Sequence, residues 1–339
     1  MKNDKFLKFG MAVIVLFIAG IFLRLAKPIL VPFSLALFLS FVISPILDFL
    51  TRRRIPRPLA VVILLLLTFA LLYLLGVMFY ASGKNFAVEL PAYGQKLKTL
   101  VDDIERMFRL DHFKGDPLGW LREIEIARIG TIFFASLGPF FGFVGDLFLI
   151  FLFLIFILAG RGRLKRKIPR AFEAGDATRV AETIQKIDRQ IQKYLALKTL
   201  ISAVTGILVT VALLIFGLPF AVVFGFIAFL LNFIPNIGSF IATSFPALLA
   251  LFHFGRFWPA FWVLVVLISI QMTLGNFIEP RLMGRELGIS PLLVIFTLFF
   301  GGWLWGLPGM VIAVPVLASF KIAFGNIPSL AFLDVMMDK

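Results

Sequence analysis

Long apolar runs, separated by short polar stretches, make up most of the chain. Three of them fill its first quarter, at Phe9–Leu23, Leu30–Leu50 and Leu59–Gly83. This pattern is typical of membrane-spanning helices, which need about 20 mainly apolar residues each. The second run carries Pro32 and Pro45, which predict a kinked or divided helix because proline removes a backbone hydrogen bond.

The polar stretches differ in charge, and this difference predicts the topology. Residues 84–130 hold eight Lys/Arg and eight Asp/Glu, and their apolar positions recur with helical periodicity, so we expect an amphipathic helical subdomain. Residues 160–198 hold eleven Lys/Arg against four Asp/Glu, and the loop 51–58 holds four arginines. Cytoplasmic loops of membrane proteins are enriched in Lys and Arg. We therefore expect both basic segments and the N-terminus to be cytoplasmic, and residues 84–130 to lie outside.

A second periodic pattern lies within the basic stretch. Apolar residues recur there at spacings of four and three, at Val180, Ile184, Ile187, Ile191 and Tyr194. The favoured interpretation is an amphipathic helix on the inner leaflet, with its arginines near anionic lipid. The alternative is a self-association seam, which would make the protein a homo-oligomer.

In the C-terminal third the helices become short and interrupted. After the run Thr199–Gly217, the run Pro219–Phe233 has 15 residues and reaches only about 22 Å as a helix. Unwound backbone survives in a membrane only where protein buries it or where it lines a wet cavity, and paired interrupted segments indicate a transport site. We hypothesise two re-entrant hairpins from opposite faces, with apices at Pro235–Gly238 and Gly301–Gly309. Full crossings are the alternative.

Composition excludes several classes of protein. With 60% hydrophobic residues and a mean hydropathy of +1.01, the chain is not a soluble domain. The net charge of +14 is concentrated in loops between apolar runs, so we expect a lipid bilayer rather than nucleic acid as the partner. The chain has no cysteine, only two histidines and no phosphate-binding loop of the ATPase type. We expect no metal, no cofactor and no ATP hydrolysis by this chain.

Motifs in residues 199–321 resemble those of the autoinducer-2 exporter family, also called the PerM-like permeases. They are Leu231–Gly238 with Pro246, Gly275–Gly284 followed by Leu287–Pro291, and Gly301–Met310 with Val314–Pro315. The resemblance implies a multi-pass protein of the bacterial inner membrane with about eight membrane segments. Members are described as exporters of a small furanone-like signalling molecule, and some as sodium/proton antiporters.

Together, pattern and resemblance predict an all-α, polytopic integral membrane protein. We expect short broken helices or re-entrant hairpins in its C-terminal third, a small extracytoplasmic helical subdomain, and both termini in the cytoplasm. The expected segments are N-terminal membrane helices at 1–83, the extracytoplasmic subdomain at 84–130, a membrane helix at 131–159, the basic cytoplasmic segment at 160–198, the C-terminal membrane region at 199–325 and a cytoplasmic tail at 326–339.

The candidate solute site consists of polar and helix-breaking residues in the interrupted region. They are Asn232, Pro235, Asn236, Gly238, Gln271, Asn276, Glu279 and Arg281. A hydroxylated neutral solute needs amide partners rather than a strong countercharge, and the three asparagines and the glutamine supply them. Glu279 is expected to pair with Arg281 or Arg285 at the membrane boundary.

Three functions remain open. The favoured one is export of a small polar organic molecule of the autoinducer-2 type by a permease that is not an enzyme. A sodium (or lithium)/proton antiporter would need a buried carboxylate, for which Asp146 and Glu279 are the candidates. The lack of an obvious acidic residue in the middle of a span weighs against that reading. A non-transporting membrane scaffold is the third class.

Overall fold

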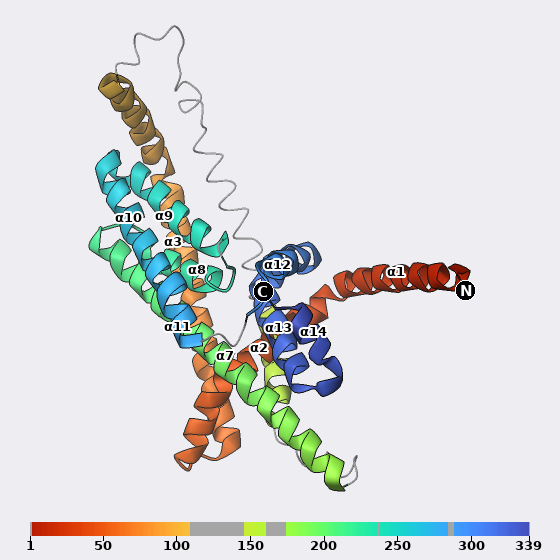
Figure 1. The fold of residues 1–339 in the computed structure, drawn as a ribbon. Helices are drawn as coiled ribbons and strands as arrows, with labels where there is room; N and C mark the ends of the chain where they lie inside the picture. Colours follow the sequence, from red (N-terminus) through yellow and green to blue (C-terminus); the bar gives the residue numbers. More distant parts are fainter. Residues whose placement is uncertain (1, 109–145, 161–173, 236, 284–287, 339) are drawn as a thin grey trace. The chain divides into compact units, whose positions relative to one another are not determined.

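In the computed structural model the described chain is almost entirely helical (Figure 1). The structure describes residues 2–108, 146–160, 174–235, 237–283 and 288–338. Its elements are α1 (Lys2–Leu25), α2 (Lys27–Arg52), α3 (Arg57–Phe108), a helix at Asp146–Gly160, α7 (Ala174–Ile215), α8 (Ala221–Leu231), α9 (Ile237–Phe254), α10 (Phe257–Met272), the π-helix η2 (Thr273–Ile278), α11 (Glu279–Met283), α12 (Pro291–Trp305), α13 (Leu307–Asn326), the 3-10 helix η4 (Pro328–Leu330) and α14 (Ala331–Met336).

The lengths and composition of these helices confirm an all-α polytopic membrane protein. Within the described residues, six helical segments are long and apolar enough to cross a membrane: Lys27–Arg52, Arg57–Met78, Val180–Ile215, Ile237–Phe254, Phe257–Leu282 and Leu307–Asn326. Three shorter apolar helices add to them, at Asp146–Gly160, α8 and α12. The total of about eight membrane segments stays a prediction.

Two of the long helices differ from what the sequence pattern suggests. The helix α2 continues through Pro32 and Pro45, so the run is not divided there. The helix α3 continues for 52 residues, so the third apolar run and the beginning of the polar stretch form one element. Of the predicted subdomain, residues 109–130 lie outside the described residues, as does the first half of the run that ends at the helix Asp146–Gly160.

The chain forms two compact units. Unit 1 contains Met1–Leu64, Asp146–Leu197 and Met283–Lys339, and unit 2 contains Leu65–Gly145 and Lys198–Leu282. The helices α3 and α7 contribute residues to both units. All of the predicted site residues except Asp146 therefore fall within unit 2.

In unit 1, part of the periodic apolar pattern at residues 180–194, here called the apolar stripe of α7, packs inside the protein. Ile191, Tyr194 and Leu195 form a buried cluster with Ala318 of α13, and partly buried side chains of α2 and of Ile187 pack against it. Burial of such a cluster against two other helices is the ordinary source of helix packing stability. At residues 187–194 the stripe thus contacts its own chain. The lipid-surface and self-association interpretations are wrong for these positions.

The helices α12 and α13 form a hairpin in unit 1 with a single-residue break. Gly306 has φ 71°, in the region that favours glycine. The helix α12 ends just before it and α13 begins just after it. Gly301 and Gly309 are helical instead of unwound, and a Cβ on Gly301 would lie 2.7 Å from the Gly309 carbonyl oxygen. The predicted interruption at Gly301–Gly309 is thus confined to one residue, and the two other glycines permit close helix approach.

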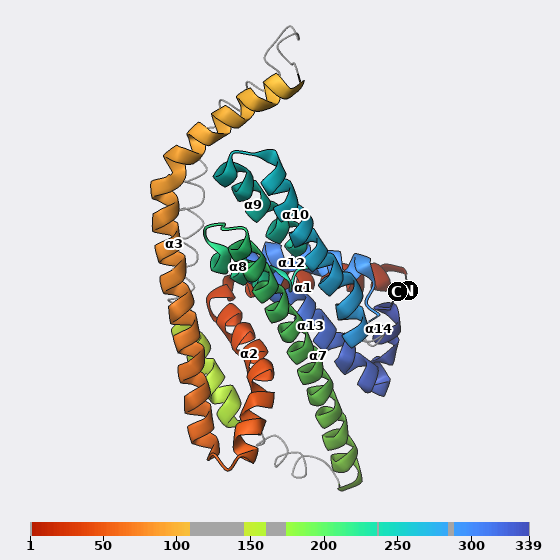
Figure 2. The same cartoon turned by 90° about the vertical axis from the view of Figure 1, so that its left-hand side faces the viewer.

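In unit 2, short helices pack closely against the second half of α7. A Cβ on Gly206 of α7 would lie 2.6 Å from the carbonyl oxygen of Gly225 in α8, so only glycine permits this approach. The helices α9 and α10 pack side by side (Figure 2). Lys96 of α3 donates to the carbonyl oxygen of His253 at the end of α9, at 2.5 Å.

Candidate functional site

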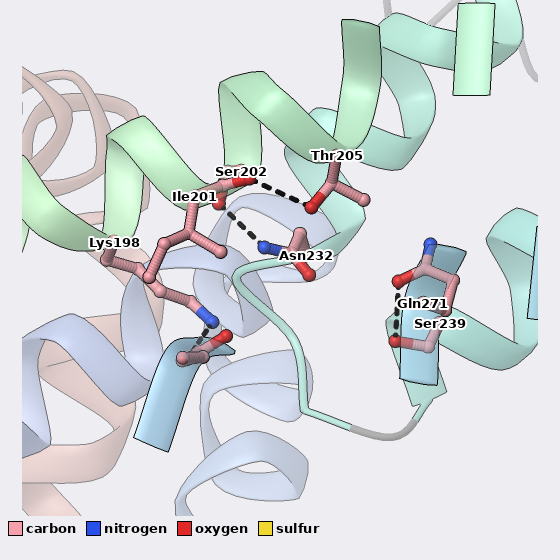
Figure 3. Close-up of polar contacts among 8 residues, drawn as sticks. Lys198, Ile201, Ser202, Thr205, Asn232, Ser239 and Gln271 are labelled. Atoms are coloured by element: carbon pink, nitrogen blue, oxygen red, sulfur yellow. Dashed lines mark hydrogen bonds and ion pairs between the residues drawn. The ribbon is translucent and has the colours of Figure 1, made fainter. Parts of the chain in front are cut away.

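One face of α7 in unit 2 is polar, although most of the neighbouring residues are apolar. Lys198, Ser202 and Thr205 are spaced by four and three residues, which places them on one side of the helix. Their exposed fractions are 5%, 0% and 0%. The Thr205 hydroxyl donates to the Ile201 carbonyl oxygen at 2.8 Å, within its own helix (Figure 3). Polar side chains in a membrane span face protein or a cavity rather than lipid, so this face turns inward.

The predicted residue Asn232 reaches this polar face from the end of α8. Its Nδ2 atom donates to the Ser202 hydroxyl oxygen at 3.0 Å, and both side chains are buried (Figure 3). The two residues that follow, Phe233 and Ile234, are each only 2% exposed. The first part of the turn between α8 and α9, residues 232–234, is therefore buried inside unit 2, as backbone within a membrane requires.

Gly238 lets the chain return from this turn into α9. A Cβ at this position would collide with the backbone carbonyl of Leu231, the last residue of α8. The amide of Gly238 donates to the Ile234 carbonyl oxygen at 3.0 Å. Pro235 lies in the same turn, and Asn236 lies outside the described residues.

Gln271 is buried in α10 and contacts the beginning of α9. The Ser239 hydroxyl donates to Oε1 of Gln271 at 3.1 Å (Figure 3). Gln271 is 7% exposed, and its Nε2 atom has no hydrogen-bond partner among the described residues. A buried amide donor without a partner costs about 1–3 kcal/mol, so it calls for an explanation.

Glu279 forms an ion pair across unit 2. Its Oε1 atom lies 2.5 Å from Nζ of Lys198, and the exposed fractions of the side chains are 7% for the lysine and 21% for the glutamate. The predicted pairing of Glu279 with Arg281 or Arg285 is not observed: Arg281 is exposed, and Arg285 lies outside the described residues. Among the described residues, the partner of Glu279 is thus the ammonium group that the fold of α7 brings to it rather than Arg281, which is closer in sequence.

A π-helix separates the two polar contacts of α10 and α11. The element η2 spans Thr273–Ile278, and such wide turns inside helices are frequent at functional sites. Gln271 precedes it and is buried, whereas Glu279 follows it and reaches α7. Asn276 lies inside η2 and is exposed, so it does not join the buried cluster.

Asp146 belongs to the other unit. It is the first residue of the helix Asp146–Gly160 and is exposed. The structure therefore places Asn232, Gln271 and Glu279 in unit 2, each with its own partner, together with Pro235 and Gly238 of the turn, and places Asp146 in the other unit.

Sequence reasoning missed Lys198, Ser202, Thr205 and Ser239. Lys198 was assigned to the basic cytoplasmic stretch because it is the last residue of that charge run. A usable signal existed, since a lysine, a serine and a threonine at helical spacing within or beside an apolar run predict one polar face.

The three contacts of Asn232, Gln271 and Glu279, called the polar cluster of unit 2 below, offer hydrogen bonds and almost no net charge. Lys198 and Glu279 neutralise each other, while Asn232, Gln271 and the hydroxyls provide neutral donors and acceptors. Among the residues that the structure describes, no group of three or more His, Cys, Asp or Glu side chains could hold a metal ion. Such an arrangement suits the recognition of an uncharged polar solute.

Comparison with known proteins gives matches along most of the chain. A family model described as AI-2E family transporter matches residues 11–329. A candidate transport protein of Haemophilus influenzae is 33% identical over 330 residues, covering 95% of this chain and 93% of its own. A candidate transport protein of Borreliella burgdorferi is 32% identical over 329 residues, which cover 96% of this chain and 88% of that protein. The protein of Escherichia coli named AI-2 transport protein TqsA is 33% identical over 318 residues, which cover 93% of this chain and 89% of that protein.

Proposed function

Because the chain belongs to the AI-2E family of transporters, we propose that it exports a small, neutral, polar organic molecule of the autoinducer-2 type through unit 2. This is the family that the motifs of residues 199–321 resemble, so that resemblance is confirmed. The chain is an integral membrane protein of a transporter family. Its placement in the bacterial inner membrane with both termini in the cytoplasm is part of the proposal, and so is transport without catalysis or ATP hydrolysis.

The observation that carries the proposal is the buried, neutral polar cluster of unit 2. A polar solute loses its water when it enters a membrane, and the lost hydrogen bonds cost several kcal/mol unless protein groups replace them. The amides of Asn232 and Gln271 and the hydroxyls beside them are groups of that kind. Since the charges of Lys198 and Glu279 cancel, a neutral solute meets no countercharge.

The proposed partners follow from the same features. The bilayer surrounds the apolar helices, the solute is the ligand, and transport follows the solute's own gradient or that of a coupled ion. A homo-oligomer remains a proposal.

Sodium/proton antiport is the second candidate, and the ion pair of unit 2 is the observation that favours it. Glu279 holds a cationic group at 2.5 Å inside the helical unit, so its carboxylate is placed to hold a cation. A sodium ion or a proton would have to displace the ammonium group of Lys198 from Glu279. Asp146, the other candidate carboxylate, lies in unit 1.

The first prediction concerns solute flux. In liposomes that contain the purified protein and are loaded with labelled autoinducer-2, we expect efflux well above that of protein-free liposomes. Gln271→Ala and Asn236→Ala are expected to reduce the efflux rate about tenfold, because each removes a hydrogen-bonding partner of the solute. Expression and oligomer size should not change.

The matched control is Ser269→Ala, two residues from Gln271 on the same helix. Ser269 is exposed, and its hydroxyl donates only to the Val265 carbonyl oxygen within α10, so its replacement should leave the flux unchanged. Parental flux in both site variants would show that these residues are packing elements.

The same liposomes distinguish the alternatives when they also contain a pH-sensitive dye. The exporter hypothesis expects a flat dye signal after a pulse of sodium or lithium. Proton movement in the parent that is lost in Glu279→Gln or Asp146→Asn would establish antiport. A folded protein that moves neither autoinducer-2 nor protons would be a scaffold.

A further inference from the structure

The amide of Gln271 is satisfied on one side only. Its Oε1 atom accepts from Ser239 at 3.1 Å, whereas Nε2 points away from Ser239 and has no partner among the described residues (Figure 3). The side chain is 93% buried, since its residue is 7% exposed. The contact with Ser239 fixes the amide, so the free nitrogen keeps a defined direction.

Among the described residues, one other buried polar side-chain atom lacks a hydrogen-bond partner, the hydroxyl oxygen of Thr199. The Thr199 hydroxyl rotates freely about one bond, and threonine in a helix can bond to a carbonyl of the preceding turn. The amide of Gln271 is held at its oxygen by Ser239, and in this orientation its nitrogen reaches no acceptor of its own helix or of the other described residues.

Nε2 of Gln271 has no acceptor within hydrogen-bond distance among the described residues. The Thr243 hydroxyl donates within its own helix, to the Ser239 and Phe240 carbonyl oxygens at 2.9 and 3.1 Å. Glu279 receives the ammonium group of Lys198. Ser239 lies in the first turn of α9, where the positive end of the helix dipole favours an electron-rich ligand atom.

We infer that Nε2 of Gln271 donates a hydrogen bond to a carbonyl oxygen of the transported solute, an inference that rests on the proposed function. A carbonyl oxygen accepts without bringing a donor of its own. A hydroxyl group in the same place would bury an additional O–H that needs a partner, at a cost of about 1–3 kcal/mol. The site thus selects solutes that carry a carbonyl oxygen over the corresponding alcohols.

The test uses a matched pair of four-carbon solutes, erythrulose and erythritol, which differ in one keto group; erythrulose is too short to close a furanose ring, so its carbonyl stays free. Both are offered to liposomes that contain the parent or Gln271→Met, and both are tested for a shift in the melting temperature of the purified protein. We expect the parent to move erythrulose about tenfold faster than erythritol and to be stabilised by erythrulose alone. Gln271→Met should lose both preferences.

Thermal stability without any solute separates a ligand-binding role from a structural one. Methionine has nearly the volume of glutamine. It removes the unpaired donor, which raises stability, and the acceptor of the Ser239 hydroxyl, which lowers it, so Gln271→Met should change the melting temperature little. A marked decrease would show that the amide chiefly stabilises the fold, and it would overturn the inference.

The outcomes for the solutes are equally separable. Equal flux of erythrulose and erythritol through the parent would overturn the selectivity and leave the transport function intact. A shift in the melting temperature with erythrulose, in a parent protein that moves neither erythrulose nor autoinducer-2, would support the donor site and remove the proposed function. No shift with either solute, or equal shifts, would overturn the inference.

Discussion

Replacing Lys198 with methionine is expected to lower the stability of the protein more than most single substitutions. The change leaves the carboxylate of Glu279 in unit 2 without the ammonium group that lies 2.5 Å from it. Removal of one partner of a buried ion pair costs about 3–5 kcal/mol, and the 21% exposure of the Glu279 side chain places the loss near the lower end. Thermal unfolding of the purified protein in detergent measures it.

A double substitution tests whether the loss comes from this pair. Lys198→Met combined with Glu279→Gln should recover most of the lost stability, because no uncompensated charge is left. Arg281→Gln is the control, since Arg281 is exposed on the same short helix as Glu279 and should change stability by no more than about 0.5 kcal/mol. If Arg281→Gln destabilised the protein as much as Lys198→Met, the pairing would be wrong.

Gly238→Ala is expected to have the second large effect. The added methyl group would overlap the backbone carbonyl of Leu231, and backbone cannot rotate aside as a flexible side chain can. The turn between α8 and α9 would have to open, at a cost of about 3 kcal/mol or more. We expect a low yield of monodisperse protein and a clearly lower melting temperature.

Gly275 provides the matched comparison. It lies in the π-helix η2, and a Cβ there would meet nothing within 4 Å. Gly275→Ala should leave the melting temperature unchanged or raise it slightly, because alanine loses less backbone freedom on folding. Equal losses in both variants would show that the close approach at Gly238 is not what requires glycine.

Hydropathy alone predicted most of the helices, because the length of an apolar run is set by the thickness of the bilayer. The runs Phe9–Leu23 and Leu30–Leu50 lie within α1 and α2, and the turn after α8 lies at Pro235 and its neighbours, where the apex was expected. Helix continuity was harder to predict. Pro32 and Pro45 do not divide α2, since packing can hold a helix together through a proline, and nothing in the sequence ends α3 near residue 83.

The candidate site was only partly predictable, because its contacts join distant parts of the chain. Amide side chains in an apolar region pointed to Asn232 and Gln271, and both are buried with hydroxyl partners. The partner of Glu279 lies 81 residues away in sequence, whereas two arginines are close by, and composition cannot choose between them. The fold made that choice by bringing Lys198 of α7 to the beginning of α11.

The central claim is that the solute passes along the polar face of α7 in unit 2. The chain has no native cysteine, so a single thiol can report on this directly. Ser202→Cys places a sulfur where the hydroxyl now accepts from Asn232, in a residue that is 0% exposed. Ser40→Cys is the control, at an equally buried position of α2 in unit 1.

The measurement is the rate at which a small membrane-permeant thiosulfonate modifies each thiol in the folded protein, with and without autoinducer-2. The account predicts that Ser202→Cys reacts, that autoinducer-2 slows its reaction, and that Ser40→Cys stays unreactive. If Ser202→Cys were as inert as the control, or reacted at a rate that autoinducer-2 does not change, the polar face would be packing and the solute pathway would lie elsewhere.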